Sequence, residues 1–287
     1  MKITFFVFSG TGNTWWAVND FKSLAGDYMI DAEVISIENS EETTEDRVIA
    51  AINNSDIIGF AYPVYGSNVP MIMKDFIDRF TSICDANGEQ LKTPLPDAMV
   101  ICTMMMFSGD GAILPKNKLE KCGFTFKWGM NVPLTSNISI PIFRANPYEK
   151  EKIEENKEKT RDKFRKLLER ISKGEKWLEH RWNVPFRLVA LLQRVSEPLL
   201  YKLVHFGVDT ERCIRCLRCV NHCPTETINY DKENDSFSFA DTCTFCMRCY
   251  NLCPEHAITA NDKVCLPPKY KRLDPIMKDF KFSDLHD

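Results

Sequence analysis

The fold of the first half of this chain is decided by its amino-terminal stretch, Ile3-Thr4-Phe5-Phe6-Val7-Phe8-Ser9-Gly10-Thr11-Gly12-Asn13-Thr14. Residues 3–8 are apolar apart from one threonine and predict a buried strand. Small and hydroxyl-bearing residues follow at once, and residues 13–25 have the apolar spacing of an amphipathic helix. The stretch therefore predicts a strand, a tight loop and a helix, which together form the first βα unit of a larger sheet.

The same alternation of strands and helices continues to about residue 145. We expect further strands at 33–37, 56–61, 98–104 and 124–132, and helices at 45–53, 70–80 and 114–122. Alternating units of this kind build a parallel sheet that is covered by helices on both faces. The sequence thus predicts an α/β fold with a doubly wound, five-stranded parallel sheet.

The composition is that of a globular protein with two domains. The chain has 287 residues, of which 44% are hydrophobic and 27% are charged, and its net charge is −3. This charge disfavours nucleic acid as a partner, because phosphate binding usually requires a basic face. The first apolar run ends after six residues, too short for a signal-peptide core or a membrane span, so we expect a cytoplasmic protein.

The loop after the first strand is suited to bind a phosphate group. Backbone N–H groups at the start of a helix attract anions, and Ser9, Thr11, Asn13 and Thr14 add side-chain donors. The loop has no Lys or Arg, unlike loops that bind nucleoside triphosphates, and Trp15 replaces the third glycine of the dinucleotide pattern. These features favour a single terminal phosphate monoester.

Eight of the twelve cysteines lie between residues 213 and 253. They form two copies of the pattern C-x2-C-x2-C-x3-C-P, offset by thirty residues, which indicates an internal duplication. Three cysteines at this spacing bind one [4Fe–4S] cluster, and the fourth reaches the other cluster. We therefore assign cluster 1 to Cys213, Cys216, Cys219 and Cys253, and cluster 2 to Cys243, Cys246, Cys249 and Cys223. Zinc fits less well, because its sites usually pair C-x2–4-C units across a longer loop.

No motif is recognisable in residues 146–208. Residues 147–179 are rich in Lys and Glu and predict a long, solvated amphipathic helix. Residues 182–206 are more apolar, but four charged residues make a membrane span costly. We favour a helical segment that packs two domains together over a helix that lies on a membrane surface. The expected divisions are 1–145, 146–208, 209–265 and a tail over 266–287.

Four arginines flank the cysteines, namely Arg212, Arg215, Arg218 and Arg248. Three interpretations stay open: they offset the negative charge of the clusters, they dock an acidic partner, or they are ordinary surface charge. The five histidines form no metal-binding or triad-like group, so no catalytic residue is predicted.

The first loop, S-x-T-G-x-T, resembles the FMN phosphate site of flavodoxins, and residues 209–262 resemble bacterial two-cluster ferredoxins. Together they resemble the flavodoxin–ferredoxin fusion proteins of anaerobes. The resemblance implies FMN, with its phosphate held by Ser9, Thr11, Gly12, Asn13 and Thr14. It also implies flavin-ring contacts from two further loops, one with Pro63, Val64, Tyr65 and Gly66 and the other with Phe107, Gly109, Asp110 and Gly111. Whether Tyr65 and Phe107 stack on the ring or only pack their loops stays open.

The function that this resemblance implies is electron transfer between two [4Fe–4S] clusters and FMN, linking a low-potential one-electron donor to an acceptor. The expected partner is a redox protein, either a ferredoxin or a reductase. The alternative is an FMN-dependent reductase of a quinone, an enone or another flavin, fed by its own clusters. A redox sensor is disfavoured because no output domain is recognisable, and the lack of a recognisable NAD(P)H domain favours electrons that arrive from another protein. Whether the protein is an enzyme stays open.

Overall fold

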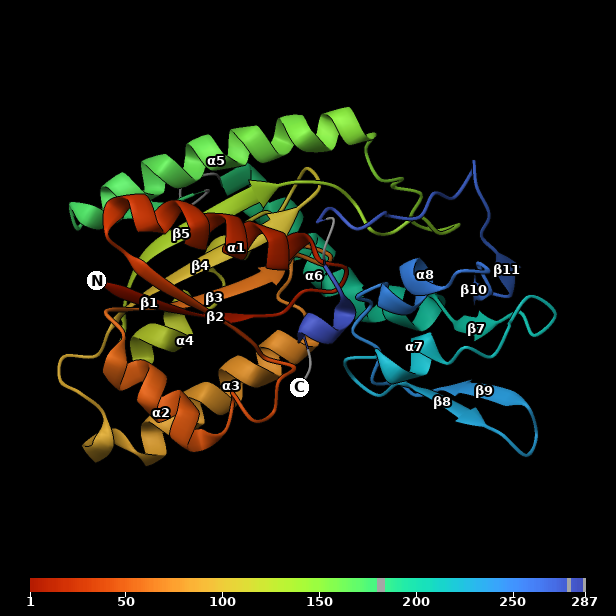
Figure 1. Ribbon diagram of the computed structural model, residues 1–287, viewed down its shortest axis with the longest axis horizontal. Coiled ribbons are helices and arrows are strands. Elements are labelled where there is room, and N and C mark those ends of the chain that lie inside the picture. Colours follow the sequence, from red (N-terminus) through yellow and green to blue (C-terminus); the bar gives the residue numbers. More distant parts are fainter. Residues whose placement is uncertain (180–183, 278–279, 286–287) are drawn as a thin grey trace.

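The computed structural model of the protein describes residues 1–179, 184–277 and 280–285. An α/β domain, formed by the first part of the chain, lies beside a smaller cysteine-rich domain, and the long helix α6 (Val184–Leu203) runs between them (Figure 1). None of the helices in this described part has the length and hydrophobicity that crossing a bilayer requires.

The α/β domain is built on one parallel sheet. Its strands are β1 (Lys2–Val7), β2 (Asp31–Ser36), β3 (Ile57–Pro63), β4 (Asp97–Met104), β5 (Thr125–Pro133) and β6 (Trp177–Leu178). They pair in parallel in the order β2-β1-β3-β4-β5-β6. The first five follow the flavodoxin-like order, in which the strand order reverses between β1 and β3. The doubly wound parallel sheet is therefore confirmed.

The predicted number of five strands is wrong by one. The sixth strand, β6, has two residues and pairs Trp177 with Trp128 of β5. A segment this short shows no alternation of apolar and polar residues, so its pattern could not reveal it.

Helices cover both faces of the sheet (Figure 1). One face carries α1 (Asn13–Ala25) and α5 (Lys150–Ser172), and the other carries α2 (Glu45–Asn54), α3 (Met71–Ala86) and α4 (Lys116–Lys121). Short 3-10 turns join some of these elements, namely η1 (Gly26–Tyr28), η2 (Gly88–Gln90) and η3 (Gly111–Ile113). Each face thus has its own hydrophobic core between sheet and helices.

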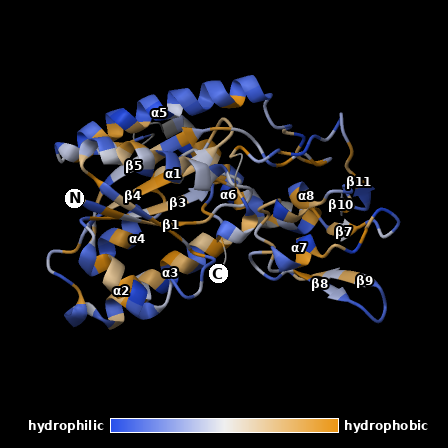
Figure 2. Cartoon of the chain, viewed as in Figure 1, coloured by the Kyte–Doolittle hydropathy of each residue, from blue (hydrophilic) through white to orange (hydrophobic). Residues whose placement is uncertain are grey.

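Helix α5 packs in the core that it shares with α1, although its sequence predicts a solvated helix. Its apolar stripe, Phe164, Leu167, Leu168 and Ile171, is buried against α1 and the sheet. The Phe164 ring meets Phe21 of α1 edge-on at 5.3 Å. Burial of each such side chain contributes about 1.5–3 kcal/mol. The rest of the helix is hydrophilic, as Figure 2 shows.

The smaller domain contains two short helices, α7 (Arg218–Asn221) and α8 (Arg248–Leu252), one within each cysteine repeat. A three-stranded sheet pairs β11 (Lys263–Val264), β10 (Ile258–Ala260) and β7 (Phe206–Val208), and a hairpin pairs β8 (Ile228–Asp231) with β9 (Ser236–Phe239). The carboxyl-terminal tail then returns to the α/β domain, where Ile276 and Met277 pack near α1 and η4 (Phe282–Leu285) lies beside the junction of the two domains (Figure 1).

Candidate functional site

A cavity of about 360 Å³ lies at the carboxyl ends of the strands, and we call it the main cavity. The first loop lines one side, and the loops after β3, β4 and β5 line the others. Open parallel sheets bind ligands at this edge, beside the point where the strand order reverses. The volume is within the usual range for a small-molecule or cofactor site.

The phosphate loop, residues 9–14, contributes Ser9, Gly10, Thr11, Asn13 and Thr14 to this lining. The Ser9 hydroxyl oxygen accepts hydrogen bonds from the N–H groups of Gly12 (3.2 Å) and Trp15 (3.1 Å), so it closes the loop onto the start of α1. The first-turn N–H groups of Asn13 and Thr14 have no acceptor within the helix, as at any helix start. They remain suited to an anion in the cavity.

The side chains of this loop are buried and partly committed to the protein. The hydroxyl groups of Thr14 and Thr103 share a hydrogen bond of 2.7 Å, and the Asn137 amide donates to the Thr11 hydroxyl oxygen at 3.1 Å. The carbonyl oxygen of the Asn13 side chain is buried and has no hydrogen-bond partner in the described part of the chain. It can accept a hydrogen bond from a ligand hydroxyl, so the loop fits a phosphorylated ligand that also carries hydroxyl groups.

The structure brings some of the predicted ring-contacting residues together and leaves others apart. Pro63, Val64, Tyr65, Gly66 and Phe107 line the main cavity. Gly109, Asp110 and Gly111 do not line it, and neither does Gly12. Asp110 instead forms an ion pair with Arg194 of α6 at 2.8 Å, while Gly109 packs against Ala190 of the same helix. Three methionines at the end of β4 and just after it, Met104, Met105 and Met106, take part in the lining.

Two contributions to the cavity were missed by sequence reasoning. One is the polar run after β5, Thr135, Ser136 and Asn137, which its position after a strand could have revealed. The other is α6, whose Gln193, Glu197 and Tyr201 face the cavity. No motif marks these residues, because their place depends on how α6 packs.

Helix α6 is fastened to the loop after β3. The Ser67 hydroxyl donates to Gln193, the Asn68 amide donates to Glu197 at 2.5 Å, and the Tyr201 hydroxyl donates to the same carboxylate. The Tyr201 ring stacks on Phe245 of the second cysteine repeat, with ring centroids 4.3 Å apart. One side of the cavity is thus closed by α6, a helix that contacts both domains.

The eight predicted cluster ligands gather around two small cavities in the cysteine-rich domain. One cavity is lined by Cys213, Cys216, Cys219 and Cys253, and the other by Cys223, Cys243, Cys246 and Cys249. These are the two crossed sets expected from the spacing. Among the described residues, no three His, Cys, Asp or Glu side chains close around a single metal-ion position. The ligands of a four-iron cluster stand further apart than those of one ion, and the two cavities suit that arrangement.

Backbone N–H groups donate to the cysteine that crosses over in each repeat. The N–H of Thr227 donates to the Cys223 sulfur at 3.3 Å, and the N–H of Ala257 donates to the Cys253 sulfur at 3.1 Å. Such bonds favour a thiolate and raise the potential of a cluster that it ligates. Burial raises the pKa of Cys246 to about 12 in the metal-free chain, so binding a metal there must release a proton.

The second cysteine repeat lies directly on the phosphate loop. A side-chain carbon at Gly10 would stand 2.5 Å from the Tyr65 hydroxyl oxygen and 2.7 Å from the Cys246 carbonyl oxygen, so only glycine permits this approach. The Asn137 amide bridges the two segments, because it also donates to the Cys246 carbonyl oxygen at 3.0 Å. Tyr65 therefore stands between the main cavity and a predicted cluster ligand.

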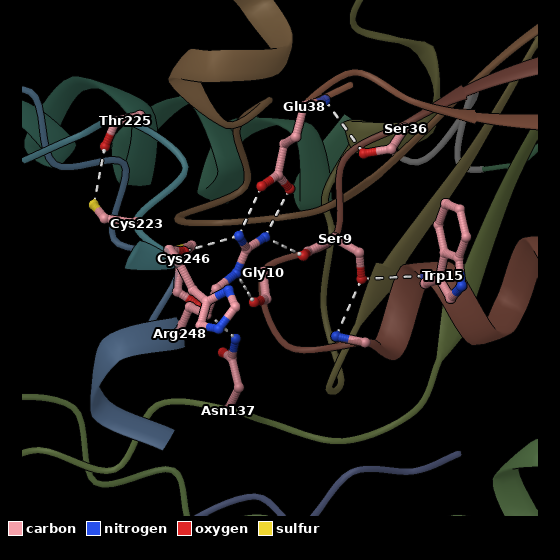
Figure 3. Close-up of polar contacts among 12 residues, drawn as sticks. Ser9, Gly10, Trp15, Ser36, Glu38, Asn137, Cys223, Thr225, Cys246 and Arg248 are labelled. Atoms are coloured by element: carbon pink, nitrogen blue, oxygen red, sulfur yellow. Dashed lines mark hydrogen bonds and ion pairs between the residues drawn. The ribbon is translucent and has the colours of Figure 1, made fainter. Parts of the chain in front are cut away.

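One buried arginine fixes this junction (Figure 3). Arg248 of α8 forms a two-pronged ion pair with Glu38, each prong 2.7 Å, and both side chains are at most 2% exposed. Its remaining N–H groups donate to the carbonyl oxygens of Ser9 (2.9 Å), Gly10 (3.0 Å) and His222 (3.0 Å). None of the three interpretations of the flanking arginines includes the role that Arg248 has here, which is to connect the two domains.

Comparison with known proteins identifies the smaller domain. Residues 212–258 match the family model described as the 4Fe-4S dicluster domain. The chain carries a 4Fe-4S dicluster domain. This dicluster domain lies beside an α/β domain whose fold is flavodoxin-like by its strand order. Together the two domains imply a role in electron transfer.

Several solved structures match a little over half of the chain at low sequence identity. A flavodoxin from the domain Archaea is 15% identical with a TM-score of 0.36, covering 58% of this chain and 99% of its own. The Megasphaera elsdenii flavodoxin is 18% identical with a TM-score of 0.36, covering 56% and 98%. The rubredoxin oxygen:oxidoreductase of Desulfovibrio gigas is 11% identical with a TM-score of 0.38, covering 58% of this chain but 36% of its own length. No curated protein matches the chain.

Proposed function

We propose that this protein is an electron-transfer protein that binds two [4Fe–4S] clusters and FMN. The observation that supports it most is the junction at Gly10, where the peptide of Cys246 lies against the loop that would hold the FMN phosphate. Two separate cofactor proteins fused by a loose linker would not require such a junction. The short distance between the Cys246 peptide and the phosphate loop favours electron exchange between the cofactors over independent roles for each.

Each cofactor has a set of residues suited to hold it. Ser9, Thr11, Asn13 and Thr14 would bind the FMN phosphate, and the two crossed cysteine sets would bind the clusters. Clusters carry single electrons, and FMN supplies both one- and two-electron chemistry when bound. The chain's own residues fix the orientation of the sites and keep water away from Cys246, the buried cysteine of the cluster 2 set.

The burial of the two cysteine repeats favours an order for the electron path. The set for cluster 2 includes Cys246, which is 7% exposed and borders the phosphate loop. The set for cluster 1 includes Cys216, which is exposed to solvent. An external redox protein would therefore exchange electrons at cluster 1, and cluster 2 would connect that site with the main cavity.

A second function, reduction of a small molecule at the main cavity, is favoured by one observation. Met106 lines the cavity and is 74% exposed, so the cavity reaches the surface. A quinone, an enone or another flavin could enter there. The described lining of the cavity also holds side chains that could donate a proton in such a reaction, namely Tyr65, Glu197 and Tyr201, so an assay has to separate the two functions.

An anaerobic assay separates the carrier from the reductase. We expect the purified, fully loaded protein to exchange electrons rapidly with a reduced ferredoxin. Its reduction of quinones, enones and free flavins should be much slower than this exchange. Turnover of one of these small molecules, sustained over many cycles with ferredoxin as the donor, would instead establish the reductase.

A further inference from the structure

The two cysteine repeats have the same backbone but different surroundings. The positive φ angles recur at matching positions, 56° at Arg215 and 55° at Phe245, then 55° at Leu217 and 61° at Met247. The helices α7 and α8 follow at the same offset. Since the duplication is preserved at the backbone, each residue of the first repeat has a structural counterpart in the second.

In the second repeat, residues 244–248 contact the α/β domain at Cys246 and Arg248, α6 at Phe245 and the core of the dicluster domain itself at Met247. All five residues are buried, with Thr244 and Met247 each 2% exposed and Arg248 1% exposed. Figure 3 shows what covers the arginine, namely the Glu38 carboxylate and the carbonyl oxygens of Ser9 and Gly10. The α/β domain thus offers this surface one carboxylate flanked by backbone acceptors.

The same surface of the first repeat is uncovered. We call it the cluster 1 face and define it as residues 214–218, the counterparts of 244–248. Ile214 is 60% exposed, and Cys216 and Arg218 are also exposed. Arg218, the counterpart of Arg248, lines the cavity of the cluster 1 cysteines. It forms no ion pair with any residue that the structure describes.

The neighbouring charges single out Arg218. Arg212 pairs with Asp209 at 3.5 Å, and Arg215 pairs with Asp235 at 2.6 Å, so both of these cations already have carboxylate partners. Glu211 is exposed nearby, and Glu255 borders the cluster 1 cavity. Arg218 is therefore the cation of this face that is available to a partner.

We infer that the cluster 1 face is the docking surface for a one-electron carrier protein with an acidic rim, whose carboxylate pairs with Arg218 as Glu38 pairs with Arg248. The inference rests on the proposed function, because docking there serves electron exchange only if cluster 1 is present. In the reaction, one electron leaves the reduced metal centre of the partner and reduces cluster 1, or passes in the opposite direction. No bond forms and no proton moves.

The chemistry of the face suits such a partner. A single exposed apolar residue, Ile214, stands among charged side chains, which resembles the small, polar interfaces of transient redox encounters. A charge at the rim of an interface mainly accelerates association and makes it depend on salt concentration. Arg218 also lies beside the cysteines, so a carboxylate bound to it would bring the partner close to cluster 1.

The test measures binding of an acidic two-cluster ferredoxin to the loaded protein, in its oxidised state and at two salt concentrations. The variant is Arg218→Glu, and the matched control is Lys166→Glu. The control makes the same charge change at an exposed residue of α5, a helix that packs on the sheet of the α/β domain. Iron and flavin contents of each protein are measured first. If the unchanged protein lacks iron or flavin, the proposed function is refuted. If the proteins carry both cofactors, the binding measurement tests the docking surface alone.

We expect Arg218→Glu to weaken ferredoxin binding about tenfold at low salt and to reduce its salt dependence, as loss of a close charge pair would. The control should change binding less than twofold, and basic cytochrome c should bind Arg218→Glu no more weakly than the unchanged protein. Equal effects of the two substitutions, or no effect of either on a loaded protein, would overturn the inference.

Discussion

At the scale of single residues, the junction of the two domains depends on the buried pair Arg248 and Glu38. An isolated charge in the interior is costly, and a buried pair is tolerated only when its remaining hydrogen bonds are satisfied. Arg248 meets this condition with three backbone carbonyl oxygens in addition to the carboxylate. Removal of either partner would leave the other charge buried alone.

We therefore expect Arg248→Met to lower the free energy of unfolding by about 3–5 kcal/mol, because Glu38 is left unpaired in the interior. Chemical denaturation of the loaded protein measures this. The double change with Glu38→Met should recover much of the loss, and Arg218→Met, at the exposed counterpart, should change the free energy by less than about 0.5 kcal/mol. An equal loss in Arg248→Met and Arg218→Met would contradict the role assigned to the pair.

The crossed ligation makes a prediction about one cysteine. Cys223 stands in the first repeat but lines the cavity of the second repeat's cysteines. Cys223→Ala should therefore damage cluster 2 and leave cluster 1, so iron should fall from about eight to about four per chain. Cys265, which is buried outside both cavities, gives the control, since Cys265→Ala should keep about eight irons. Iron analysis with electron paramagnetic resonance of the reduced protein checks both.

Two threonines of the phosphate loop are expected to govern FMN retention. Thr11 and Thr14 line the main cavity and can turn their hydroxyl groups toward a phosphate. Because a hydrogen bond to a charged group contributes about 1.5–3 kcal/mol, Thr11→Ala and Thr14→Ala should each weaken FMN binding at least about tenfold. Ser23→Ala, at an exposed position of α1, is the control and should have no effect. Quenching of FMN fluorescence during titration measures the affinity. Unchanged affinity in both threonine variants would show that this loop does not bind the FMN phosphate.

At the scale of elements, α6 is the segment that completes the main cavity. It is held to the loop after β3 by Gln193 and Glu197, and it packs on the loop after β4 at Gly109. Gly109 has a φ of 60°, and a side-chain carbon there would lie 2.3 Å from the methyl group of Ala190. The helix can therefore lie this close only because the residue is glycine.

Gly109→Ala should push α6 away from the cavity and accelerate FMN release several-fold, because the closing helix would lose its contacts with the loops. The rate of FMN dissociation, followed by its fluorescence, measures this. Gly26→Ala is a suitable control, since nothing lies within 4 Å of its added carbon. The same release rate in both variants would show that α6 does not retain the ligand.

The elements differ in how much of them the sequence could predict. The strand and helix of the first βα unit, the alternating units that follow and the crossed cysteine sets all have local patterns of apolar residues or spacing. The two-residue strand β6 has no such pattern, and α6 reads as a linker because its cavity-facing residues are ordinary polar ones. Burial of Arg248 could not be foreseen either, because its counterpart Arg218 stands in the same Arg-Cys-x-Asn pattern and is exposed.

At the scale of the whole molecule, a symmetric duplication has become asymmetric. The second repeat is joined to the α/β domain through Arg248, Asn137 and the close approach at Gly10, while the first repeat stays open to solvent. We propose that the equivalent cysteine sets thereby serve different tasks, the second set exchanging electrons with the main cavity and the first set with a partner. The order of the sites along the proposed electron path follows from this difference in burial.

The measurement that tests the central claim most directly is an anaerobic reductive titration of the loaded protein with ferredoxin as the mediator. We predict about four electrons per chain, one for each cluster and two for FMN, with bleaching of both the iron–sulfur and the flavin absorption. Uptake of about two electrons, with flavin absorption that stays unbleached after the clusters are reduced, would contradict an electron path between the two domains.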